Sequence, residues 1–320
     1  MKSIATISRQ NNRQLLITRN NILATLAYFD MWDYPLTRGE IYLFLENKYG
    51  QNDFDEALLY ITDNKLVFRF DKFYSLKNDY MIAVRRIKGN KKAAELIIKA
   101  KEVGAFLVKF PYVRGIAISG SLSKNCADDN SDIDFFIITE ANRLWLARTF
   151  MHLFKKLTFL VGKQHNYCMN YFIDEAQLQI VEKNIYTAIE VATIIPVEGD
   201  ATFENFYKAN AWSSDFLPNK CMRLAIANPL KKHWYKSLVE MLFNNRFGSW
   251  LDNTFMRITA GRWNKKTEQK KLNMRGTVMS MAASKHFAKP SPENFQRKLI
   301  ERYRLKVSML LQESEERLAQ

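Results

Sequence analysis

The sequence has few of the residues that build disulfide frameworks or metal clusters. It contains three cysteines and four histidines among 320 residues. Cys126, Cys168 and Cys221 are far apart, odd in number and free of CxxC spacing, and the histidines form no ligand motif with them. We therefore expect reduced cysteines and no zinc site.

Long apolar runs are also absent. No stretch of about 18 apolar residues is present that could span a membrane, and residues 1–13 are polar and lack the apolar segment of a signal peptide. The hydrophobic fraction of 47% is nevertheless enough to fill the cores of two or three domains. These features predict a cytoplasmic protein without a membrane span.

Acidic residues are scarce only in the last third of the chain. Residues 219–320 contain 21 Lys and Arg but 8 Asp and Glu, a net charge of +13, whereas residues 1–218 contain 27 and 25, a net charge of +2. A basic C-terminal surface would attract a triphosphate and a polyanionic acceptor such as RNA or DNA. A solvated basic face is an equally good interpretation, because the cations are spread along the expected helices and no RNA-binding motif is visible.

The most informative segment combines a strand, a Gly-Ser pair and two aspartates. An apolar run over 113–118 predicts a buried strand, and Gly120-Ser121 follows it at the start of a short helix. A glycine there lets a phosphate approach backbone N–H groups, and the serine hydroxyl can donate to a phosphate oxygen. Asp132 and Asp134 are two residues apart on an expected strand over 132–139, so their side chains should share one face. Such a carboxylate pair suits Mg²⁺ or Mn²⁺.

This combination resembles the signature of the DNA polymerase beta type nucleotidyltransferase superfamily, in which Gly-Ser precedes Asp-x-Asp at this spacing. The alternative, two solvent-facing aspartates on an ordinary strand, leaves the Gly-Ser pair unexplained. The resemblance implies a small mixed sheet with helices on one side and transfer of an NMP from an NTP to a hydroxyl acceptor, which could be a small molecule, a protein side chain or an RNA end. The nucleotide- and phosphate-binding candidates are Gly120, Ser121, Lys124 and Ser131, and the candidate ligands of two Mg²⁺ or Mn²⁺ ions are Asp132 and Asp134.

The third acid of that family has no clear counterpart in this chain. We expect a helix over 141–161 and the next strand over 166–173, where Asn170 takes the position that the resemblance gives to the third acid. Asn offers a neutral carbonyl in place of a carboxylate that also helps to take the proton from the attacking hydroxyl. Asp174 is on the same face but four residues further on, about 13 Å away. The catalytic candidates are therefore Asp132, Asp134 and Asn170.

The N-terminal part has its own pattern. Three helical segments, the second with a capping box from Thr37 to Glu40, are followed by a hairpin over 66–76. This order resembles a winged helix. The expected recognition helix is acidic, so we favour a docking or packing module over a DNA reader. Its acidic residues are Asp53, Asp55, Glu56 and Asp63.

The whole chain is expected to be an α+β protein in four parts. These are a winged-helix-like module over 1–78, a linking helix over 79–112, a nucleotidyltransferase core over 113–180 with a mixed sheet, and a basic helical C-terminal domain over 181–320. In the last part, helices are expected over 182–195, 231–257 and 274–286.

Three functions remain open from the sequence. The first is a Mg²⁺-dependent nucleotidyltransferase, and the second is a catalytically weakened relative that binds nucleotide or a partner as a regulator. A DNA-binding regulator is the third. The residue that faces Asp132 and Asp134 from the strand over 166–173 distinguishes the first two.

Overall fold

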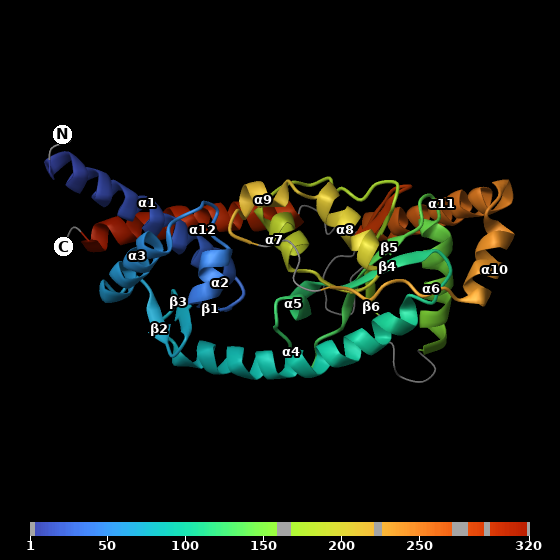
Figure 1. Ribbon diagram of the computed structural model, residues 1–320, viewed down its shortest axis with the longest axis horizontal. Coiled ribbons are helices and arrows are strands. Elements are labelled where there is room, and N and C mark those ends of the chain that lie inside the picture. Colours follow the sequence, from blue (N-terminus) through green and yellow to red (C-terminus); the bar gives the residue numbers. More distant parts are fainter. Residues whose placement is uncertain (1–3, 159–167, 221–225, 271–280, 291–294, 319–320) are drawn as a thin grey trace.

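The computed structural model describes residues 4–158, 168–220, 226–270, 281–290 and 295–318. It is an α+β structure with a three-stranded and a six-stranded sheet. Figure 1 shows the small sheet and its helices at one end of the molecule, the large sheet toward the other, and one long helix, α4 (Tyr80–Leu107), running between them.

The N-terminal module contains three helices and a hairpin. Its small antiparallel sheet has the order β1-β3-β2. The capping box is confirmed: the Thr37 hydroxyl accepts from the Glu40 backbone N–H, and the Glu40 carboxylate accepts from the Thr37 N–H. The elements are α1 (Ile4–Asp30), β1 (Leu36–Thr37), α2 (Arg38–Leu43), α3 (Gln51–Asp63), β2 (Phe68–Phe70) and β3 (Phe73–Ser75).

The linking helix α4 is fixed to this module by a buried arginine. Asp79 caps its first turn by accepting from the Met81 N–H. Arg86 donates to the Glu40 carboxylate at 2.6 Å and to the Pro35 carbonyl at 3.1 Å, and its guanidinium lies 3.6 Å from the centre of the Tyr34 ring. Arg86 therefore holds the module against α4. One of its partners, Glu40, also belongs to the capping box of α2.

The large sheet is mixed and has the order β7-β4-β5-β6-β9-β8. Strand β5 pairs with β4 in the antiparallel sense and with β6 in the parallel sense. Side chains alternate along β5: Phe135 and Ile137 belong to the core with α4 and α6 (Leu144–Thr158), whereas Phe136 and Ile138 belong to the core with α8 (Asp200–Ala209). The strands are β4 (Val113–Ile118), β5 (Asp134–Thr139), β6 (Cys168–Asp174), β7 (Ile195–Glu198), β8 (Met281–Ala283) and β9 (Phe287–Pro290).

The expected helical region over 181–320 contributes three of these six strands, so that expectation was wrong. The helix expected over 182–195 is α7 (Ile185–Thr193), and Pro196 follows it in β7 at the sheet edge, where a missing N–H is tolerated. In place of the helix expected over 274–286, residues 281–283 form β8, and residues 274–280 lie outside the described chain. The helix expected over 231–257 is two helices, α10 (Trp234–Phe243) and α11 (Arg246–Glu268), because Asn245 caps the second by accepting from the Gly248 N–H.

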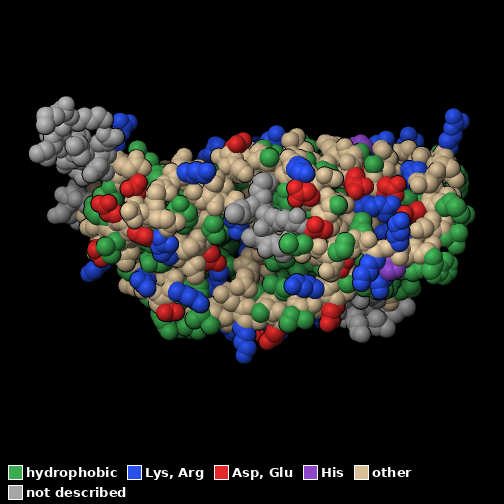
Figure 2. Space-filling view, viewed as in Figure 1, with side chains coloured by type: hydrophobic (Ala, Val, Ile, Leu, Met, Phe, Trp, Pro, Cys, Tyr) green, Lys and Arg blue, Asp and Glu red, His purple; other side chains and the backbone are tan. Residues whose placement is uncertain are grey.

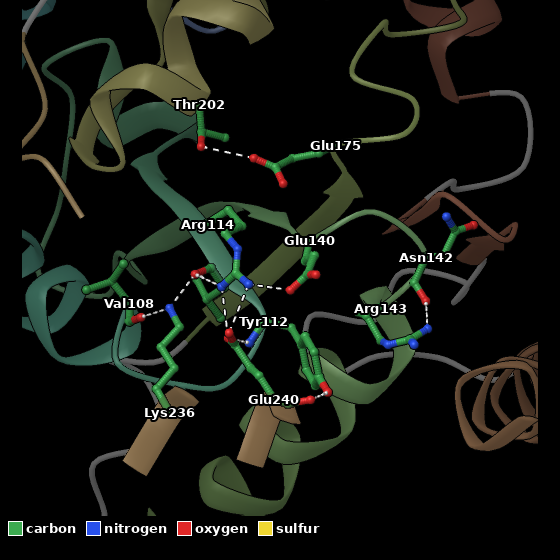
Figure 3. Close-up of polar contacts among 11 residues, drawn as sticks. Val108, Tyr112, Arg114, Glu140, Asn142, Arg143, Glu175, Thr202, Lys236 and Glu240 are labelled. Carbon is green, nitrogen blue, oxygen red and sulfur yellow. Dashed lines mark hydrogen bonds and ion pairs between the residues drawn. The ribbon is translucent and has the colours of Figure 1, made fainter. Parts of the chain in front are cut away.

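A polar network fixes α10 to the beginning of β4 (Figure 3). The Glu240 carboxylate accepts from the Tyr112 backbone N–H at 2.6 Å and from the Arg114 guanidinium at 2.8 and 3.0 Å. Lys236 is buried and donates to the carbonyls of Val108 and Val113 at 3.0 and 2.6 Å. Burial, followed by the nearby Arg114 charge, lowers the pKa of Lys236 to about 8.

The surface in Figure 2 has no large region of one charge. Lys and Arg side chains are distributed over this face among Asp and Glu side chains. Of the helices in the described part of the chain, none is both long enough and apolar enough to cross a membrane.

Candidate functional site

Gly120 lies in the turn after β4, against the side chain of Asp134, the first residue of β5. Its φ of +69° is in the left-handed region, and a Cβ added there would lie 2.8 Å from Oδ2 of Asp134. The Ser119 N–H donates to the Asp134 backbone carbonyl at 2.9 Å. The backbone angle favours glycine, and any other residue here would displace the Asp134 carboxylate.

The two aspartates do not lie on one strand. Strand β5 begins at Asp134, so Asp132 precedes it, and the alternation argument for a shared face does not apply. Both carboxylates nevertheless lie near the Cys168 thiol, which is opposite Asp134 in the β5–β6 register. Burial, then the Asp134 charge and, more weakly, the Asp132 charge raise the pKa of Cys168 to about 12. Asp132 and Asp134 thus flank the beginning of β6.

Asn170 faces Asp134, as the sequence analysis anticipated. The β5–β6 register shifts between Phe135 and Phe136, where Asn170 is an extra residue on β6. Its Nδ2 donates to Oδ1 of Asp134, and its Oδ1 accepts from the Cys168 thiol at 3.1 Å. An amide that donates to Asp134 thus lies where a third carboxylate was expected.

Asp174 lies at the opposite end of β6. It pairs with Thr139 in the register, five residues along β5 from Asp134. Its carboxylate is fully buried, accepts from the backbone N–H of Asn142 at 2.8 Å, and contacts Nδ1 of His286 at 2.9 and 3.0 Å. These contacts give Asp174 a structural role away from the other two aspartates.

The side chains near Asp134 fit a cation that takes most of its ligands from substrate phosphates and water. Within the described residues, no group of three His, Cys, Asp or Glu side chains is arranged to hold a metal ion. Mg²⁺ is often bound by one or two carboxylates together with substrate phosphates and water. Asp132 and Asp134 can supply those carboxylates, and rotation of the Asn170 amide would turn its carbonyl toward the cation.

Of the other phosphate-binding candidates, Lys124 lies beside Gly120, whereas Ser121 and Ser131 line a different cavity. Lys124 donates to the Glu190 carboxylate at 2.8 Å and to the Gly120 carbonyl at 3.1 Å. Ser131 donates to the Asp128 carboxylate at 2.9 Å. Ser121 and Ser131 line a second cavity of about 700 Å³ against α4, whose walls include Arg85, Lys88, Lys91 and Lys92.

A cavity of about 460 Å³ opens beside Gly120, Asp134 and Asn170. It lies on the α7 and α8 side of the sheet, and several of its lining residues are aromatic. The lining residues include Tyr171, Glu182, Tyr186, Glu190, Lys289 and Phe295. Apart from Tyr171 on β6, these six come from α7 and the segment before it, from β9 and from α12 (Phe295–Leu318), which are far from the motif in the sequence.

Comparisons with known proteins add no assignment. No protein-family model matches the chain, and neither curated proteins nor solved structures give a significant match.

Proposed function

We propose that this protein is a Mg²⁺-dependent nucleotidyltransferase that moves an NMP from an NTP to a hydroxyl acceptor and releases pyrophosphate. The observation that supports the proposal most strongly is the close approach of Gly120 and the Asp134 carboxylate at the mouth of the 460 Å³ cavity. The positive φ of a glycine beside a carboxylate, next to an aromatic-lined cavity, is the arrangement expected for a phosphate chain and its counter-ion.

Each residue of the site would have a separate role in binding the phosphates and the divalent ion. The backbone at Gly120 would position the phosphates, and Asp132 and Asp134 would hold the divalent ion. When bound, that ion would neutralise charge on the phosphates and lower the pKa of the acceptor hydroxyl. Asn170 would orient Asp134 through the hydrogen bond from Nδ2. The acceptor could be a small molecule, a protein side chain or an RNA end.

The N-terminal module fits a docking or packing role better than DNA reading. The acidic residues of α3 are exposed, and Arg38 pairs with one of them, Asp55, at 2.6 and 2.7 Å. Phosphates would be repelled by the remaining carboxylates on this helix.

A second function is favoured by one specific observation. Asn170 cannot take a proton from an acceptor hydroxyl, and its amide donates to Asp134. A protein with this site could bind nucleotide and act as a regulator without transferring it.

The deciding experiment is incubation of the purified full chain with each labelled NTP and Mg²⁺ or Mn²⁺, followed by detection of pyrophosphate and of labelled product. Calorimetry of the same mixtures measures binding separately. We expect NTP binding that requires the divalent ion, and we expect Asp132→Asn combined with Asp134→Asn to abolish that dependence.

The matched control is Asp53→Asn combined with Asp55→Asn, which removes two carboxylates from α3, far from the cavity. Binding without transfer would favour the regulator, and metal-dependent NTP binding that survives the Asp132 and Asp134 changes would contradict the proposal.

A further inference from the structure

The 460 Å³ cavity has flat, apolar walls suited to a ring system. Phe136 and Tyr171 pack with ring centres 5.0 Å apart, and Tyr186 and Phe295 lie edge to face at 5.8 Å. All four residues line the cavity whose mouth is formed by Gly120 and Asp134. Aromatic faces of this kind stack on nucleobases of any type, so stacking alone gives no preference for one base.

The selective end of the cavity is an ion pair between Glu182 and Lys289. Lys289 is more than nine-tenths buried, donates to Oε1 of Glu182, and lies 5.7 Å from the centre of the Tyr171 ring. Oε2 of Glu182 is shielded from solvent and has no hydrogen-bond partner among the described residues. The Glu182 side chain is 39% exposed overall, so rotation of its carboxylate would turn this oxygen into the cavity, where it could accept from a ligand N–H.

The distance between the two ends suits a nucleotide. Asp134 is on β5 and Lys289 is on β9, and only β6 lies between these strands. Two strand spacings amount to about 10 Å across the sheet, and the register places Lys289 level with Phe136, two residues along β5 from Asp134, so the two positions are about 12 Å apart. A ligand with its phosphates at Gly120 can therefore reach Glu182 and Lys289 with its base.

We propose that this cavity binds the guanine ring of GTP, an inference that rests on the proposed function and names its nucleotide. Guanine alone among the common bases presents two adjacent donors, N1–H and the N2 amino group, beside the acceptor O6. Glu182 accepts from the two donors, and Lys289 donates to O6. Adenine offers the acceptor N1 to the lysine but a single donor group, the N6 amino group, so it makes one hydrogen bond fewer to Glu182.

The test is calorimetric titration of the full chain with GTP, ITP, ATP, CTP and UTP in Mg²⁺. GTP should bind most tightly. ITP, which lacks the N2 amino group, should be weaker than GTP but tighter than ATP. Glu182→Gln retains an oxygen for Lys289 and should weaken GTP binding by roughly 5- to 150-fold, the range for one good bidentate contact to a base. Its effect on ATP should be small.

Glu56→Gln on α3 removes a carboxylate far from the cavity and should leave all five affinities unchanged. Thermal unfolding of each variant separates loss of fold from loss of recognition. If ATP binds as tightly as GTP, or if Glu182→Gln leaves GTP affinity unchanged, the guanine inference is wrong while the proposed function stands. If none of the five nucleotides binds, both are wrong.

Discussion

At the scale of single residues, Gly120 is the position where the site tolerates least change. It combines a left-handed backbone with a carboxylate oxygen 2.8 Å from the place of a Cβ. Most glycines of the chain meet neither condition. Gly261, in the middle of α11, has no atom within 4 Å of its Cβ position.

Gly120→Ala should therefore weaken both the fold and nucleotide binding. An alanine at positive φ costs about 1–2 kcal/mol, and the Asp134 carboxylate must move to make room for the methyl group. Chemical denaturation would give the loss in free energy of unfolding, and calorimetry would give the loss of metal-dependent NTP affinity.

Gly261→Ala is the matched control. In an open helical position alanine should be neutral or stabilise by up to about 1 kcal/mol. If the two glycine variants behave alike, Gly120 does not have the role assigned to it.

Asn170 gives a second prediction at this scale. Asn170→Asp places a carboxylate against Asp134, so the metal-free protein should become less stable through repulsion between like charges. Added Mg²⁺ or Mn²⁺ should reverse this loss, and the rise in melting temperature on adding metal should exceed that of the unmodified chain. Turnover should increase, with general-base effects of about 10²- to 10⁴-fold as the upper scale.

Asn52→Asp, an exposed change of the same charge on α3, controls for net charge. A response to metal that is equal in the two variants would show that residue 170 does not approach a cation. Asp174→Asn should lower stability, because it disturbs the buried contact with His286, and should leave the metal response unchanged.

The sequence predicts the local part of the site better than the distant part. Gly120 and Asp134 could be found because their spacing reflects one turn between two strands, and Asn170 could be placed by counting along the next strand. Glu182 could not be found, because it approaches the site only when the segment before α7 packs against the sheet. The direction of the Asp132 side chain was argued from a strand that begins two residues later.

At the scale of elements, the contact between α10 and β4 depends on a buried lysine. Lys236 is 6% exposed and donates to two backbone carbonyls. Glu240, one turn later on the same helix, is also partly buried. Burial tends to raise the pKa of that carboxyl, but the hydrogen bonds from Arg114 and from the Tyr112 N–H lower it overall.

The pH dependence of stability should report on Lys236. The pKa of this lysine is about 8 in the folded chain against 10.5 ordinarily, so the folded state binds fewer protons between these values. The free energy of unfolding should therefore rise as the pH increases from about 8 to 10.5, by about 3 kcal/mol from this group. Denaturation at several pH values would measure the rise.

Lys236→Met removes the titrating group and should remove this rise, while lowering stability because two carbonyls lose their donor. The exposed Lys232→Met should keep the dependence of the unmodified chain. An identical pH profile for Lys236→Met and the unmodified chain would show that this lysine is not responsible.

Helices with local signals were predictable, and strands that depend on partners were not. The Thr37–Glu40 capping box fixed the beginning of α2, because its hydrogen bonds join residues three apart. Strand β7 has four residues and forms through its pairing with β4, which lies far earlier in the chain. No periodicity in four residues can reveal such a partner.

At the scale of the whole molecule, α4, α7 and α12 each connect the N-terminal module to the part of the chain that carries the large sheet. In Figure 1, α4 runs along one side and α12 returns along the other to lie beside α1. Tyr303 of α12 packs edge to face on Tyr28 with ring centres 5.6 Å apart and donates to the Glu46 carboxylate at 2.7 Å. Lys306 pairs with Asp30 at the end of α1.

The helix α12 contacts both the 460 Å³ cavity and the N-terminal module, and α7 does the same, since it lines the cavity and packs in the core of the module. Phe295, Gln296 and Arg297 in its first turn line the 460 Å³ cavity, and Tyr303 lies two turns later in the module. If nucleotide binding moves the first turn of α12 and this movement reaches Tyr303, the two ends of the helix are coupled. Such a coupling would be reciprocal: a protein docked on the module would then alter nucleotide affinity by the same factor by which nucleotide alters the affinity for that protein.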